Sequence, residues 1–254
     1  MTGRLLRTAV SPRAGAQLAR LRRSEVALVG PAPAPALVGV FGAHPRAGTS
    51  TLAALLAQAL AALAPGRVAV LDGDGIQQAQ RDRLGCTTLP PAGGLRQLTS
   101  APQAIRSRRV VEQFVAGQVP LLAPLPAERT PIPPPQLDTA TRLLRRRFPV
   151  VVADAPVHAR EWAVATADQV VIVGVPGKEL ITASRAIRAT RRGQHTVTVA
   201  AASPPDGLLP REIDVAFPAD STLAPAGTVR LAALALPALA AIEELVSLLL
   251  PARL

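Results

Sequence analysis

The sequence predicts one α/β domain built on a mostly parallel β-sheet that helices cover on both faces. Short apolar runs alternate along the chain with longer Ala/Leu-rich or amphipathic segments, which is the order of elements expected of βαβ units. The apolar runs are continuous and do not alternate with polar residues, as is typical of strands buried on both faces. A chain of 254 residues, of which 49% are hydrophobic, is long enough to enclose a sizeable core.

Each element is predicted from its local pattern. Strands are expected where the apolar runs lie, at residues 36–41, 67–71, 119–122, 149–153, 169–175 and 196–201. Helices are expected where the chain is Ala/Leu-rich or amphipathic, at residues 49–63, 136–147, 179–192 and 229–250. The last helix is expected to break near Pro237, because proline removes a backbone donor. Residues 124–135 form a Pro-rich loop, and residues 85–103, interrupted by Gly and Pro, fit neither pattern.

Residues 1–35 are predicted to form a basic arm and a Pro-rich linker, and residues 36–254 the compact domain. Six arginines precede the first acidic residue, Glu25, and prolines alternate with alanines in residues 31–35. A basic segment with interleaved leucines suits an anionic membrane surface, nucleic-acid phosphates or an acidic protein partner. A solvated tail is the alternative, and the residues alone leave these options open.

Composition excludes several functional classes. Aromatic residues make up 2% of the chain, too few for the stacking platforms of RNA or single-strand readers. The single cysteine, Cys86, rules out an intramolecular disulfide and a cysteine-cluster metal site. No apolar run reaches the ~20 residues of a spanning helix, and the N-terminus lacks the apolar stretch of a secretory signal. A cytoplasmic location is therefore expected, with peripheral binding at a membrane as the alternative.

The net charge of +11 is partly a matter of composition. The basic residues include only one lysine, Lys178, and the chain has no asparagine, a bias expected of a GC-rich genome. Arginine clusters at residues 106–109, 142–147 and 185–192 suit DNA phosphates, but charged helix faces are more often simply solvated. Trp162 is expected to lie in the core, and the last helix is expected to pack on the sheet.

Residues able to bind phosphate and metal follow three of the predicted strands. A turn between Gly42 and Gly48 joins the first strand to a helix, so that free backbone N–H groups meet a positive helix end. Asp72 and Asp74 follow the second strand, and Asp154 follows a later one. Ligands of parallel sheets bind at these carboxyl ends. Each feature alone is common, and Asp72 alone is as easily a helix cap, but the ordered set predicts a site for phosphate and Mg²⁺.

The ordered set resembles the MinD/ParA family of deviant-Walker-A P-loop ATPases, over about residues 36–250. The family's loop reads approximately K-G-G-x-G-K-T-T, and residues 48–51 (GTST) fall on its G-K-T-T positions. Further stretches resemble, in order, the family's second acidic motif, its Walker B motif, the following strand and helix, and a late P-x-D-x-x-L loop. They lie at residues 68–74, 148–156, 167–187 and 217–227. The resemblance implies a P-loop NTPase fold.

The resemblance also implies ATP and Mg²⁺ as ligands and assigns roles to particular residues. Nucleotide-binding positions fall on Arg46, Gly48, Thr49, Ser50 and Thr51, metal-binding positions on Ser50, Asp72 and Asp154, and the position that orients the attacking water on Asp74. Dimers of the family usually close around nucleotide, so a homodimer is implied as well. Many members position larger machines, which implies protein partners in an assembly.

The loop departs from the family where the family carries positive charge. The Walker lysine position holds Thr49, and the signature lysine position holds His44, which is mostly neutral at pH 7. Pro45 follows without an N–H group, and no asparagine is present to contact adenine. Losing one electrostatic group of this kind commonly costs ~10²–10³ in rate, because phosphoryl transfer depends on positioning and charge. These departures predict a pseudo-ATPase.

The predicted function is that of a scaffold, positioning or regulatory factor for a larger bacterial machine in secretion (type VII secretion included), pilus assembly or division. ATP and Mg²⁺ are then bound weakly or not at all. If they are not bound, the loop is an empty vestige and Ser50 is simply a residue at the start of a helix. The alternative is a slow ParA-type ATPase in DNA partitioning, in which Arg46 replaces the loop lysine. A Rossmann-type dinucleotide enzyme fails on spacing, because Gly39, Gly42 and Gly48 do not form G-x-G-x-x-G.

Overall fold

The computed structural model describes residues 36–101, 107–191, 194–203, 210–223 and 226–249. The basic arm and linker predicted for residues 1–35 lie outside the described residues, as do Arg106 and Arg192 of the arginine clusters. The first strand begins at Ala36, directly after the predicted linker.

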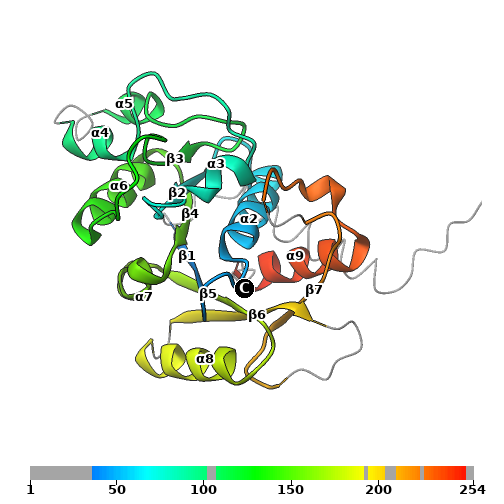
Figure 1. Ribbon diagram of the computed structural model, residues 1–254. Coiled ribbons are helices and arrows are strands. Elements are labelled where there is room, and N and C mark those ends of the chain that lie inside the picture. Colours follow the sequence, from blue (N-terminus) through cyan, green and yellow to red (C-terminus); the bar gives the residue numbers. More distant parts are fainter. Residues whose placement is uncertain (1–35, 102–106, 192–193, 204–209, 224–225, 250–254) are drawn as a thin grey trace, which may run out of the picture.

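A seven-stranded sheet forms the centre of the molecule (Figure 1), in the order β3-β2-β4-β1-β5-β6-β7. Its strands are β1 (Ala36–Gly42), β2 (Val68–Asp72), β3 (Leu121–Leu122), β4 (Val150–Ala155), β5 (Gln169–Gly174), β6 (His195–Ser203) and β7 (Val215–Pro218). Every pair of neighbouring strands is parallel. The predicted fold class, a single α/β domain around a parallel sheet, is confirmed.

Helices cover both faces of this sheet (Figure 1). On one face lie α2 (Thr49–Leu63) and α9 (Leu236–Leu249). On the other face lie α4 (Leu95–Ser100), α5 (Arg108–Glu112), α6 (Pro134–Arg147), α7 (Arg160–Thr166) and α8 (Lys178–Thr190). The short helix α3 (Ala79–Arg83) packs against α2. Two 3₁₀ turns, Val157–Ala159 and Leu231–Ala233, precede α7 and α9.

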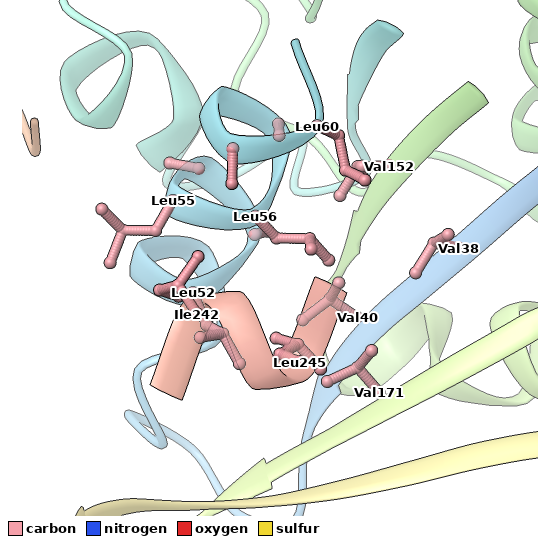
Figure 2. Packing of buried hydrophobic residues seen from close by; sticks show 14 of the residues in the cluster. Val38, Val40, Leu52, Leu55, Leu56, Leu60, Val152, Val171, Ile242 and Leu245 are labelled. Atoms are coloured by element: carbon pink, nitrogen blue, oxygen red, sulfur yellow. The ribbon is translucent and has the colours of Figure 1, made fainter. Parts of the chain in front are cut away.

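Helix α2 is held on the sheet by a row of buried leucines. Figure 2 shows these leucines together with α9 residues against valines of the central strands; the labelled residues are Leu52, Leu55, Leu56, Leu60, Ile242, Leu245, Val38, Val40, Val152 and Val171. Burying one such side chain fully contributes about 1.5–3 kcal/mol. Because α2 continues directly from the turn after β1, this packing also sets where that turn lies.

Several boundaries differ from those predicted. The segment predicted as the last helix is interrupted just before Pro237: the 3₁₀ turn Leu231–Ala233 ends, and α9 begins at Leu236. Pro237 is the second residue of α9, where its missing N–H group forfeits no intrahelical bond. The apolar run at residues 119–122 supplies only the two-residue strand β3. Strand β7 escaped prediction because four residues ending in proline show no clear period.

The last helix packs on the sheet as predicted. Its buried residues Ala238, Ile242, Leu245 and Leu249 belong to the same core as α2, and its contacts are with β7, α2 and β6. Among the helices in the described ranges, none is long and apolar enough to cross a membrane.

Trp162 is a core residue, as predicted. Its side chain is 6% exposed, and its indole Nε1 donates a hydrogen bond to Asp138 Oδ1 at 2.6 Å. The bond joins α7 to α6, and a buried indole N–H normally finds such a partner. As the only tryptophan of the chain, Trp162 is a specific fluorescent probe of unfolding.

Several arginines of the predicted clusters are engaged within the molecule. Arg185 and Arg188 of α8 pair with Glu212 and Asp214, respectively. Arg191 is buried and donates hydrogen bonds to backbone carbonyls that include Ala167 O at 2.7 Å. On the other arginine-rich helix, α6, two side chains form ion pairs as well, Arg145 with Asp168 and Arg147 with Glu112. Much of the charge of these clusters therefore holds elements together.

Candidate functional site

A cleft of about 1180 Å³ opens at the carboxyl ends of the strands. Residues that follow β1, β2 and β4 form one side, and residues of β5, β6 and β7 form the other. Most of the predicted site residues line it, namely Arg46, Gly48, Thr49, Ser50, Thr51, Asp74 and Asp154. Asp72 is fully buried and does not line the cleft. The strand-end residues thus meet where the sequence predicted a ligand site.

The turn after β1 leads into α2 through two residues with positive φ. Gly48 has φ +88° and immediately precedes the helix, a conformation that favours glycine. Arg46 has φ +62° and is exposed at the cleft. The turn is also tight, because a Cβ on Gly42 would lie 2.9 Å from Thr49 Oγ1 and 2.7 Å from the carbonyl oxygen of His44. The Thr49 hydroxyl therefore lies close to the beginning of the turn.

His44 is held by its own chain. The backbone N–H of Val175 donates to His44 Nε2 at 3.3 Å, and His44 Nδ1 lies 2.9 Å from the carbonyl oxygen of Pro45. One neutral tautomer, with the proton on Nδ1, satisfies both contacts. At the two positions where the resemblance puts lysines, the side chains are thus a short hydroxyl and an imidazole bound to backbone.

Gln80, which no sequence motif singled out, lies between Ser50 and Asp154. Its amide Nε2 donates to the carbonyl oxygen of Ser50 at 2.9 Å and to Asp154 Oδ2 at 2.8 Å. Ser50 and Asp154, two of the residues predicted to bind metal, therefore lie close together, but the amide group of Gln80 bridges them. Gln80 belongs to the five-residue helix α3, which is too short to show a periodic pattern, so no local signal in the sequence marks it.

Asp72 and Asp74 organise the backbone that follows β2. Asp72 Oδ1 accepts the N–H of Asp74 at 2.9 Å, and its Oδ2 accepts the N–H of Gln80 at 3.2 Å. Asp74 Oδ1 accepts the N–H groups of Ile76 and Gln77. Asp72 is thus placed as a buried organiser of the turn and of α3, whereas Asp74 is partly exposed at the cleft.

Burial changes the acidity of two of these carboxyl groups. Desolvation raises the pKa of Asp72 well above its usual range, and the nearby charge of Asp154 raises it further. Desolvation also raises the pKa of Asp154, to about 6, against the opposing hydrogen bonds from Ser50 and Gln80. Within the described residues no lysine lies at the cleft to offset these acids, since Lys178 begins α8 outside it.

Asp220 also lines the cleft, and it belongs to the stretch that resembles the family's late P-x-D-x-x-L loop. Asp220 Oδ1 accepts the N–H of Thr222 at 2.8 Å, and Oδ2 accepts the N–H of Ala235 at 2.8 Å. These bonds, with the Thr222 hydroxyl first, hold the pKa of Asp220 below its usual range. The loop is thereby fastened to the beginning of α9.

Comparison with solved structures finds similar folds at low sequence identity. MinD from a MinC:MinD cell division protein complex of Aquifex aeolicus is 16% identical, with a TM-score of 0.64, and the match covers 84% of this chain and 95% of that one. MinD of Pyrococcus horikoshii OT3, complexed with Mg-ADP, is 14% identical with a TM-score of 0.63, over 83% and 94% of the two chains. A putative plasmid partition protein of Borrelia burgdorferi, bound to AMPPNP, is 11% identical with a TM-score of 0.57, over 86% and 99%.

Comparison with models of protein families gives no match, and neither does comparison with curated protein sequences. The structural matches each cover more than four fifths of this chain. The parallel sheet with its covering helices is a MinD- and ParA-like P-loop fold.

Proposed function

We propose that this chain is a pseudo-ATPase with a MinD/ParA-like fold that acts as a scaffold, positioning or regulatory factor in a larger bacterial assembly. The assembly belongs to secretion (type VII secretion included), pilus formation or cell division. Its protein partners bind without a cycle of hydrolysis, a homodimer included, and ATP with Mg²⁺ is bound weakly or not at all. The sequence resemblance and the shared fold support the MinD/ParA-like part of the proposal. The charge of the cleft supports the absence of ATP hydrolysis.

The observation that carries this proposal is the charge of the cleft. The arginines that line it are Arg46 and Arg83, whereas three aspartates line it, Asp74, Asp154 and Asp220. Arg83 already donates to the carbonyl oxygen of Gly227 at 3.2 Å. A triphosphate is strongly anionic, and its transfer needs cations aimed at the β- and γ-phosphates. A cleft with more acidic than basic side chains is poorly suited to both binding and transfer.

Exposed apolar side chains at the same edge support a role in protein binding. Ile76 is 45% exposed, and Val157 and Val175 are each 53% exposed. They follow β2, β4 and β5, so all three stand at the carboxyl ends of neighbouring parts of the sheet. Clustered apolar side chains on a surface commonly mark sites of protein interaction.

Isothermal calorimetry with ATP and Mg²⁺, followed by a phosphate-release assay, tests the proposal. We expect binding weaker than micromolar and no hydrolysis above the buffer control, because the loop lacks both lysines. Asp74→Ala should leave these readings unchanged, since no reaction depends on that carboxylate. Hydrolysis by the wild-type chain that Asp74→Ala abolishes would contradict the proposal.

A slow ParA-type ATPase in DNA partitioning is the second candidate, and Arg46 is the observation that favours it. Arg46 is exposed at the cleft with a left-handed backbone, and no ion pair in the described part of the chain involves it. A guanidinium can bind phosphate in a bidentate manner. This candidate requires hydrolysis that Arg46→Ala removes, together with salt-sensitive binding to duplex DNA that survives deletion of residues 1–30.

A further inference from the structure

The Mg²⁺ of a P-loop protein is held by a Ser or Thr at the end of the loop and by an acid after a neighbouring strand. Mg²⁺ requires oxygen ligands in near-octahedral geometry at about 2.0–2.1 Å. The matching groups here are the Ser50 hydroxyl and the Asp154 carboxylate, and both residues line the cleft. Asp154 Oδ2 also accepts from Gln80 Nε2 at 2.8 Å. The donor set present therefore does not fit Mg²⁺ in this arrangement.

No other side chains nearby complete a metal site. Among the described residues, no group of three or more His, Cys, Asp or Glu side chains is placed to hold a metal ion. Asp72, the third predicted ligand, uses Oδ1 and Oδ2 to accept backbone N–H groups of Asp74 and Gln80. An amide group, with its two N–H donors, stands where a cation would otherwise face Asp154.

The Gln80 side chain is held firmly in this position. It is fully buried, its backbone N–H is bound by Asp72 Oδ2 at 3.2 Å, and the two bonds of its Nε2 end on β4 and on the first turn of α2. Withdrawing the amide would remove the donor from the buried oxygen Asp154 Oδ2, which is unfavourable. In the described part of the molecule Gln80 Oε1 has no hydrogen-bond partner, so the hydrogen bonds of this amide group are those of its nitrogen.

We propose that Gln80 is a built-in substitute for the divalent cation: its amide joins the beginning of α2 to the end of β4 and holds the cleft in one arrangement without metal or nucleotide. The inference rests on the proposed pseudo-ATPase function and deepens it, because a cleft locked in this way presents the same surface to a protein partner at all times.

Titration of the full-length chain with Mn²⁺ alone, followed by electron paramagnetic resonance and by Tm, tests the proposal. We expect no Mn²⁺ binding by the wild-type protein at millimolar metal and no change in its Tm. Gln80→Glu places a third carboxyl group beside Asp72 and Asp154, so it should lower the Tm in the absence of metal. Mn²⁺ should then bind at least tenfold more tightly than to the wild type and raise the Tm again, because a ligand that binds only the folded state stabilises it.

Gln78→Ala is the matched control. Gln78 is also a buried glutamine of the same connection, and its Nε2 donates to the backbone carbonyls of Leu125 and Glu128. Its loss should lower the Tm without creating any response to Mn²⁺. Gln80→Ala should lower the Tm to a similar extent and should gain weak Mn²⁺ binding, because the Asp154 carboxylate is then free to bind metal.

Two results would overturn the proposal: wild-type protein that binds Mn²⁺ as tightly as Gln80→Glu, or Gln80→Glu and Gln80→Ala that gain no Mn²⁺ binding at all. Neither result depends on ATP hydrolysis. A wild-type chain that fails to hydrolyse ATP but binds Mn²⁺ readily therefore refutes only the role of Gln80. A chain that hydrolyses ATP refutes the pseudo-ATPase proposal, whatever the variants do.

Discussion

The free energy of unfolding should fall as the pH rises from about 4.5 to 6.5, the reverse of the usual behaviour of paired carboxylates. Asp154 has an ordinary pKa of 3.8 in the unfolded chain and a pKa of about 6 in the folded protein, and the pKa of Asp72 is raised as well. Between these values the folded protein holds protons that the unfolded chain has released. Raising the pH therefore favours unfolding across this window.

The expected loss from Asp154 alone is roughly 3 kcal/mol, because one unit of pKa corresponds to about 1.4 kcal/mol. Below the window the opposite trend applies, since Glu212 and Asp220 have pKa values below their usual range. Urea unfolding followed by Trp162 fluorescence at a series of pH values measures both trends. Stability that rises steadily from about pH 4.5 to 6.5 would show that the two buried acids are not protonated in the folded state.

Asp154→Asn separates this effect from other titrations. The amide oxygen can still accept the Gln80 hydrogen bond, but the buried charge is gone, so the variant should be more stable than the wild type at pH 7. It should lose the part of the pH dependence that Asp154 contributes and keep the part due to the buried Asp72. Asp82→Asn, at an exposed position of α3, is the matched control and should keep the wild-type dependence on pH.

Gly75→Ala should destabilise the protein strongly. A Cβ at this position would lie 1.9 Å from the carbonyl oxygen of Thr130 and 3.0 Å from Ile132 Cγ1. The nearer atom belongs to backbone, so relief requires the Pro-rich loop to move away from the turn that carries Asp74. We expect a loss at or above the upper end of the about 1–3 kcal/mol typical of overpacking, measured by urea unfolding.

Gly177→Ala is the control for this substitution. A Cβ there would meet only the carbonyl oxygen of Val175, at 4.0 Å, and the backbone of Gly177 is extended, with φ 163°. Because Gly177 immediately precedes α8, a loss below about 1 kcal/mol is expected. Equal losses at the two positions would mean that the contact between Gly75 and the Pro-rich loop contributes nothing specific to stability.

The order of strands and helices was predictable because each element leaves a local pattern. Continuous apolar runs mark strands covered on both faces, and all six predicted runs fall on strands, from β1 to β6. The cleft was predictable for a similar reason, since parallel strands bring the residues that follow them to one edge. The short elements α3, α4, α5, α7 and β7 were missed because they contain too few residues to show a period.

The interaction partners of the charged residues could not be predicted in the same way. Arg185, Arg188 and Arg191 look alike in the sequence, yet the first pairs with Glu212, the second with Asp214, and the third is buried against carbonyl oxygens. Whether an arginine faces solvent or an acid depends on which loop folds against its helix. Local sequence carries no information on that choice, so the surface charge available to a ligand could not be counted beforehand.

The residue types at the loop, above all Thr49 and His44 in place of lysines, were decided by sequence alone, and they already argued against efficient phosphoryl transfer. Tertiary structure decided what stands in the place of the cation. Gln80 reaches Ser50 across 30 residues and Asp154 across 74, and Asp72 is withdrawn beneath the cleft. Hydrogen bonds between such distant positions exist only because the parallel sheet brings β2 beside β4 and packing places α3 against α2. A pattern along the chain cannot reveal them.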